Sequence, residues 1–127
     1  MQIEQISVFM ENKSGRLSEV TAVLFDAGIS VKAMILADLS DFGVLRMIVD
    51  DPQKAKAHLK HQGFVVNSAP VFALDFENPS NGTQSVLDTL NQAGLNVEYM
   101  YAFADMEKGK ITMIFMVDDP DKAAELI

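Results

Sequence analysis

Apolar side chains alternate near the start of the chain and then recur at helical spacing. Ile6, Val8 and Met10 are separated by single residues, a period that predicts a strand with one buried face. An amphipathic helix is predicted next, because apolar residues follow at spacings of three and four: Leu17, Val20, Leu24 and Ala27. Gly28 is expected to end this helix, since a left-handed C-terminal residue is commonly glycine.

The segment that follows predicts two more strands, a second helix and a further strand. In chain order the expected elements are a strand over 29–35, a hairpin loop over 38–43, a returning strand over 44–49, a helix over 52–62 and a short strand over 64–66. The second helix is expected at Pro52 because Asp51 is a good N-cap and proline suits the first helical position.

The chain also contains an internal repeat. Matching residues lie 66 positions apart in the first part of each copy and 68 positions apart in the second part. The matches include Glu11-Asn12 with Glu77-Asn78, Ala27-Gly28 with Ala93-Gly94, and residues 49–52 with residues 117–120. A register change of two residues reconciles the offsets, and we expect it near a loop over residues 105–110. The repeat predicts two units, residues 1–69 and 70–127. The second ends before its last expected strand, so it is either cut short or completes its sheet differently.

The order of strands and helices in each unit predicts the fold class. A βαββαβ order is typical of the ferredoxin-like topology, in which helices cover one face of an antiparallel sheet. We therefore predict an α+β fold of two ferredoxin-like units, packed side by side into one antiparallel sheet with the helices on one face. Close packing is expected because a unit of about 60 residues buries too little surface to be more than marginally stable.

Composition and charge exclude several kinds of chemistry. The 127 residues include no cysteine, which rules out disulfides and cysteine-ligated metal centres. A net charge of −8 argues against a nucleic-acid partner, since such binding depends on Lys and Arg neutralising phosphates. No apolar run or leader predicts membrane insertion or secretion, so a cytoplasmic location is expected. The charge is uneven: residues 1–69 carry 7 Lys and Arg against 8 Asp and Glu, whereas residues 70–127 carry 3 against 10.

The turn between the first strand and the first helix, residues 11–17, is the best candidate for a binding site. Backbone N–H groups at a helix N-terminus attract a carboxylate or a phosphate. Gly15 lets a ligand approach the backbone, and Asn12 offers the donor and acceptors that a zwitterion needs. The alternative is ordinary turn chemistry, in which these polar residues only cap the helix.

This turn, together with the stretch from Ala27 to Val31, resembles the opening of an ACT domain. ACT domains are small regulatory βαββαβ modules of amino-acid metabolism, found in enzymes such as phosphoglycerate dehydrogenase and aspartate kinase. The resemblance covers nearly the whole chain as two tandem copies. It implies an eight-stranded sheet, with amino acids bound between the first turn of one unit and the second strand of its neighbour.

The resemblance also implies two sets of ligand-binding residues. The first is Asn12, Ser14, Gly15, Leu17, Asn96 and Met100, in which Asn12 holds polar groups and Leu17 seats the helix. The second is Asn78, Ser80, Ser30 and Met34. The second set departs from the pattern, because Asn81 and Thr83 stand where the first has Gly15 and Leu17. A one-residue shift to Gly82 would compensate, but we expect the first site to be functional and the second to be degenerate.

Other features have plain structural explanations. Asp50-Asp51 and Asp118-Asp119 are explained by helix starts rather than by a cation site. His58 and His61 lack a third ligand nearby in sequence, so surface histidines are favoured over a metal site. The methionines on predicted strands are expected in the core: Met10, Met34, Met47, Met100, Met113 and Met116. No nucleophile, acid–base cluster or phosphate loop can be assembled, so neither an enzyme nor a cofactor is expected.

The sequence and the resemblance together favour a non-catalytic regulatory module. It would bind a free amino acid between its units and signal in trans to a partner enzyme or regulator, as a monomer or a homodimer. The alternative is a protein–protein assembly module with no small-molecule ligand, whose complexes would be indifferent to amino acids.

Overall fold

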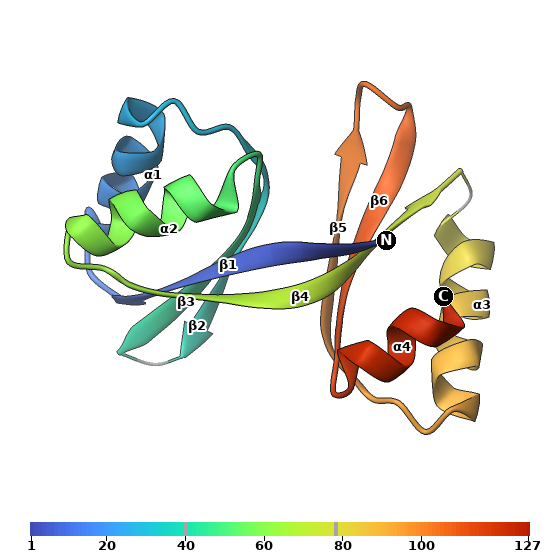
Figure 1. Cartoon of the computed structure of the whole chain (residues 1–127). Helices are drawn as coiled ribbons and strands as arrows, with labels where there is room; N and C mark the ends of the chain where they lie inside the picture. The colour runs from blue at the N-terminus through green and yellow to red at the C-terminus, as the bar shows by residue number, and fades with distance from the viewer. Residues whose placement is uncertain (40, 78) are drawn as a thin grey trace. The chain divides into compact units, whose positions relative to one another are not determined.

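The computed structural model describes every residue except Ser40 and Asn78 (Figure 1). The chain forms two compact units: the first unit is Glu4–Ala69, and the second unit is Met1–Ile3 with Pro70–Ile127. The described elements, in chain order, are β1 (Gln2–Glu11), α1 (Arg16–Asp26), β2 (Val31–Leu39), β3 (Phe42–Val49), α2 (Pro52–His61), β4 (Val65–Phe76), α3 (Pro79–Gln92), β5 (Val97–Asp105), β6 (Lys110–Val117) and α4 (Pro120–Leu126).

The described strands form one antiparallel sheet in the order β2-β3-β1-β4-β6-β5. In the first unit this order is β2-β3-β1-β4, and the second unit repeats it as β5-β6-β4-β1. The predicted α+β fold of two ferredoxin-like units is confirmed. The sheet has six strands instead of the eight that the resemblance implied, because β1 and β4 are each divided between the units.

The last strand position of the second unit is taken by the start of the chain. The Ala73 N–H donates to the Met1 carbonyl at 2.9 Å, and the Met1 ammonium group donates to the Ala73 carbonyl at 3.2 Å. This reciprocal exchange is typical of a hydrogen-bonded antiparallel pair. The second unit thus completes its sheet with residues from the opposite end of the sequence.

β4 is much longer than the short strand predicted over residues 64–66. It runs for 12 residues and supplies strand residues to both units. The sequence does not predict its full length, because residues typical of turns lie in its middle: Asn67, Ser68 and Pro70. Strand pairing outweighs their local preferences, which are only a weak guide to strand formation.

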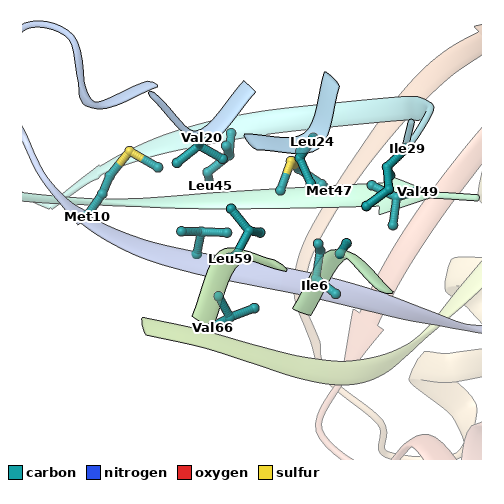
Figure 2. Packing of buried hydrophobic residues seen from close by; sticks show 12 residues of the cluster. Ile6, Met10, Val20, Leu24, Ile29, Leu45, Met47, Val49, Leu59 and Val66 are labelled. Atoms are coloured by element: carbon teal, nitrogen blue, oxygen red, sulfur yellow. The ribbon is translucent and has the colours of Figure 1, made fainter. Parts of the chain in front are cut away.

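Each unit packs its helices on one face of its sheet around an apolar core. In the first unit, side chains of β1, β3 and β4 point toward α1 and α2 (Figure 2). The buried cluster is Ile6, Val8, Met10, Val20, Leu24, Ile29, Leu45, Met47, Val49, Ala55, Leu59 and Val66. The second unit has a corresponding cluster of Phe72, Leu90, Leu95, Phe115, Val117 and Ala123. The predicted buried faces of the first strand and first helix are confirmed, although Leu17 is 38% exposed.

The two hairpins of the repeat differ in loop length. β2 and β3 pair as far as Leu39 and Phe42, whereas β5 and β6 pair as far as Asp105 and Lys110. The second loop is longer by two residues, which confirms the expected place of the register change. The loop predicted over 38–43 is shorter than expected, because strand pairing continues to its tip.

The aspartate pairs have the same local roles in both units. The side chains of Asp51 and Asp119 accept from the backbone N–H three residues later, at 3.1 Å in each case, and a proline follows each aspartate. Both predicted N-caps are confirmed. The preceding Asp50 and Asp118 accept from the backbone N–H groups of Ser30 and Asn96, at 3.0 Å in each case.

Asp51→Ala should lower the free energy of unfolding by about 1 kcal/mol, because it removes the N-cap of a helix that packs on the first unit's core. Urea denaturation followed by circular dichroism measures this loss. Asp26→Ala, at an exposed position near the end of α1, is the control and should leave the midpoint unchanged or slightly higher. Equal losses for the two variants would contradict the capping role.

Asp75 on β4 links the stability of the fold to pH. Its carboxylate accepts from Thr112 Oγ1 at 2.7 Å and from Lys108 Nζ at 3.0 Å. The hydrogen bond from Thr112, and then that from Lys108, hold the pKa of Asp75 below its ordinary value of 3.8. A lowered folded pKa means that this stabilisation is present above pH 3.8 and is lost as the pH falls through the folded value.

Asp75→Asn should therefore destabilise the protein at neutral pH, and the difference from wild type should shrink as the pH falls below 3.8. Urea midpoints of the two proteins, measured in parallel along a pH series, test this. A difference that does not change with pH would show that the charge of Asp75 is unimportant.

Candidate functional site

The turn between β1 and α1 is held in an open conformation by its backbone. The Asn12 N–H donates to the Asp41 carbonyl at 2.8 Å, which ties the turn to the β2–β3 hairpin. Gly15 has a φ of 89°, a left-handed value that favours glycine. Among the described residues, no atom lies within 4 Å of the place where a Cβ on Gly15 would stand. The backbone of this turn is accordingly open to a ligand.

The N-cap residue of α1 makes no side-chain hydrogen bond to the helix end. That residue is Gly15, so the capping that Ser or Asn would provide there does not occur, in contrast to Asp51 and Asp119. The Arg16 N–H reaches the Lys13 carbonyl at 3.3 Å. Within the described part of the chain, the N–H groups of Leu17 and Ser18 have no backbone acceptor. A helix end with free N–H groups carries a partial positive charge that suits an anion.

A cavity of about 230 Å³ lies beside this helix end. It is lined by Met10, Glu11, Asn12, Lys13, Arg16, Leu17, Leu36, Ala37 and Gly43. Gly43 shapes the wall, because a Cβ there would stand 3.2 Å from Leu36 Cδ1. The lining thus combines polar residues of the turn with apolar residues of α1 and β2.

The charged side chains around the turn neutralise one another. Lys13 Nζ lies 2.7 Å from a Glu11 oxygen, and Arg16 contacts Glu19 at 3.0 Å and Glu11 at 3.9 Å. The hydrogen bond and the positive charge of Lys13 hold the pKa of Glu11 below its ordinary value, with a smaller effect from Arg16. With two cations and two anions in balance, the helix end itself decides the sign of the local field.

A larger cavity, of about 300 Å³, shares Met10, Glu11 and Arg16 with the first. Its other lining residues are Phe9, Glu19, Phe42, Gln62, Gly63, Phe64 and Val65. It does not include the residues of the open turn, Asn12 to Gly15. Of these two cavities in the described part of the chain, the smaller joins the turn to apolar residues, so we take it as the candidate site.

The corresponding part of the second unit differs at the start of its helix. Gly82 matches Arg16 at the repeat offset, yet α3 begins at Pro79, so the helix starts earlier and the turn is shorter. A Cβ on Gly82 would overlap the ring of Phe76, so that ring already occupies the space beside the glycine. Thr83 Oγ1 donates to Met113 Sδ at 2.9 Å. The space beside Gly82 is thus narrower than the space beside Gly15.

The structure brings only some of the sequence-predicted residues together. Asn12 and Leu17 line the cavity, whereas Ser14 and Gly15 lie in the same turn outside the described lining. Seating the helix would place Leu17 in the core. In the structure Leu17 is 38% exposed and lines the cavity. Asn96 and Met100 belong to the second unit, and Met100 packs against that unit's core.

The second predicted set is more dispersed. Ser30 is held by its backbone, which exchanges hydrogen bonds with Asp50. Met34 is on β2 and is 42% exposed, although core packing was expected for the strand methionines. Ser80 lies in the first turn of α3, and Asn78 lies outside the described residues.

Sequence reasoning missed the wall formed by Leu36, Ala37 and Gly43. The strand alternation did contain a signal for Leu36. It pairs with Leu45, whose side chain lies in the core, so both side chains are on the same face of the sheet. Leu36 is nevertheless 49% exposed. What the alternation could not show is that α1 leaves this end of β2 uncovered.

The described residues were compared with the requirements of a membrane-spanning helix and of a metal site. Within them, no helix is long and apolar enough to cross a membrane. The same residues contain no group of three or more His, Asp or Glu side chains that could hold a metal ion.

Comparisons with known proteins agree with this architecture. A family model described as an ACT domain pair matches residues 1–127. The solved structure of protein BT0572 from Bacteroides thetaiotaomicron is 40% identical, with a TM-score of 0.88 over 99% of this chain and 86% of that one. Among proteins with curated descriptions, no significant match was found.

Two more distant structures share the fold. The regulatory subunit of aspartate kinase from Thermus thermophilus, in a ligand-free form, is 15% identical, with a TM-score of 0.68 over 97% of this chain and 87% of that one. The equivalent subunit from Thermus flavus is 16% identical, with a TM-score of 0.66 over 99% and 90%. At these identities the likeness shows a shared fold. Because the family model spans every residue of the sequence, the chain belongs to the ACT domain family as an ACT domain pair.

Proposed function

We propose that this chain is a non-catalytic regulatory module that binds a free amino acid beside the N-terminus of α1. It would signal the bound state in trans to a partner enzyme or regulator. The observation that carries the proposal is the uncapped helix end at Gly15, which lies beside a cavity of about 230 Å³ with polar and apolar walls.

The α-carboxylate of the ligand would lie at the N–H groups of Leu17 and Ser18, which have no backbone acceptor among the described residues. Hydrogen bonds to a charged group contribute about 1.5–3 kcal/mol each, and the helix end adds about 0.3–1 kcal/mol. Two or three such contacts support binding of about 4–8 kcal/mol, which corresponds to millimolar to micromolar affinity. The open backbone at Gly15 permits this approach.

The rest of the ligand would be recognised by the remaining walls. Asn12 and Glu11 offer acceptors for the α-ammonium group, which a simple anion does not have. Leu17 and Leu36 provide an apolar surface, which favours an amino acid with an aliphatic side chain. We retain Ser14 and Gly15 as proposed ligand-binding residues of this turn, and we propose that the second set (Asn78, Ser80, Ser30 and Met34) is degenerate.

Signalling would follow from a shift between arrangements of the protein. A ligand changes such an equilibrium only by its different affinity for the two arrangements. The turn suits this role because the Asn12 N–H links it to the hairpin between β2 and β3. Ligand contacts at the turn would therefore be felt at β2 and β3.

A melting scan against the common amino acids tests the proposal. A ligand present at about 100 times its dissociation constant adds about 2.7 kcal/mol of stability, which raises the melting temperature by several degrees. A scan in which no amino acid changes the transition would remove the amino-acid proposal. A stable protein complex that ignores added amino acids would then favour the assembly module.

The site itself is tested by a matched pair of substitutions. Asn12→Ala should abolish the ligand-induced shift, because it removes a donor and an acceptor from the proposed site. Asn78→Ala, at the repeat-related position, should leave most of the shift. Isothermal titration of both variants separates lost binding from lost stability, and equal losses would contradict the proposed ranking of the two sites.

A further inference from the structure

The larger cavity of the first unit, of about 300 Å³, has no part in the proposed amino-acid site. Three phenylalanines line it: Phe9, Phe42 and Phe64. Phe9 is 40% exposed and Phe42 is 58% exposed, and neither belongs to the buried cluster of the first unit. An aromatic lining with a few polar groups is typical of a small-molecule pocket, and the volume is at the lower end of the range for such pockets.

The strand register places a carboxylate beside the two exposed rings. Glu11 is the partner of Phe42 across the β1–β3 pair, so these two side chains are on the same face of the sheet. Phe9 lies two residues before Glu11 on β1, and side chains at that spacing share a face. Glu11 therefore has Phe9 beside it along the strand and Phe42 opposite it on the neighbouring strand.

The charged side chains that line the larger cavity leave one negative charge in excess. Glu11 and Glu19 line it with a single cation, Arg16, which contacts Glu19 at 3.0 Å and Glu11 at 3.9 Å. Of the two cavities, Lys13 lines only the smaller, which therefore has two cations against Glu11. The smaller cavity thus favours an anionic group, and the larger cavity favours a cationic one.

We infer that the larger cavity binds a small organic ammonium ion that has an apolar body and no carboxylate of its own. The ammonium group would lie at Glu11 and Glu19, whose side chains are 43% and 55% exposed and so accessible to it. The apolar body would pack on Phe9, Phe42 and Phe64. A cation is attracted to the face of an aromatic ring, and carboxylates accept charge-assisted hydrogen bonds from an ammonium group.

The second unit does not repeat these features. At the repeat offsets, three residues of the cavity change their chemical character: Phe9 corresponds to Asp75, Glu19 to Ser85 and Phe42 to Lys110. Two rings and one carboxylate are thus specific to the first unit, although both units have the same fold. The aromatic and acidic lining is therefore not a requirement of the fold.

The two cavities share Glu11 and Arg16, so ligands in them would affect each other. An ammonium ion at the two glutamates would compete with Arg16 for their carboxylates. The guanidinium group would then be available to a carboxylate in the smaller cavity, and each ligand would strengthen the binding of the other, since coupling between sites is reciprocal. This consequence rests on the proposed function, but the ammonium site does not.

An NMR titration of the wild-type chain tests the site with three probes of similar size: 2-phenylethylammonium, the neutral 2-phenylethanol and the anion phenylacetate. The ammonium probe should shift the amide signals of Gly63, Phe64 and Val65, which line only the larger of the two cavities, with a dissociation constant of about 1 mM. The alcohol should bind several times more weakly, and the anion should leave these three signals unchanged. Equal binding of the alcohol and the ammonium probe, or no shift of these signals by the ammonium probe, would overturn the inference.

Two substitutions in the larger cavity separate the contributions of charge and ring. Glu19→Gln removes the excess negative charge and Phe42→Leu removes a ring, and each should weaken binding of 2-phenylethylammonium about threefold. The matched controls on α1 are Asp26→Asn, at an exposed position, and Phe25→Leu, at a side chain that is 82% exposed; both lie outside this cavity and should leave the affinity unchanged. Wild-type affinity in either cavity variant would overturn the inference. Because the titration contains no amino acid, its failure is distinguishable from a failure of the amino-acid melting scan.

Discussion

Both units depend on the hydrogen-bonded pairing of β1 with β4. Each of these strands is divided between the units, so this one pair supplies two of the four strand positions of each unit. A ferredoxin-like unit of about 60 residues has little core of its own. Sharing strands allows both units to complete four positions with six strands in total. The two copies of the repeat therefore cannot be separated near residue 69 without removing a strand position from each.

Duplication has preserved what the fold requires and has altered what a ligand would contact. The helix-capping Asp51 and Asp119 make the same bonds in both units, and Gly28 and Gly94 both have left-handed backbone conformations. The turns differ instead: the first is open at Gly15, whereas the ring of Phe76 fills the space beside Gly82. A helix end needs N–H groups without backbone acceptors and open space to bind an anion, and the first turn combines them among the described residues.

Much of the fold could be predicted because its signals are local. Periodicity located the buried face of β1 and of α1, and a single Asp-Pro step located the start of α2 and α4. β4 was underestimated because Pro70 and its polar neighbours resemble a turn. The cavity wall at Leu36 was missed for a related reason, since alternation shows which face a residue shares but not whether a helix covers that face.

The sequence by itself determined the repeat, the helices and most strands of each copy, the two aspartate N-caps and the place of the glycine turn. Each depends on the spacing of apolar residues or on bonds within a few positions of the chain. Only the tertiary structure decided that Met1 pairs with Ala73, that β1 and β4 serve both units, and that Leu36 and Gly43 complete a cavity beside Asn12. These contacts join residues far apart in sequence, and strand pairing across such distances leaves no periodic signal in either segment.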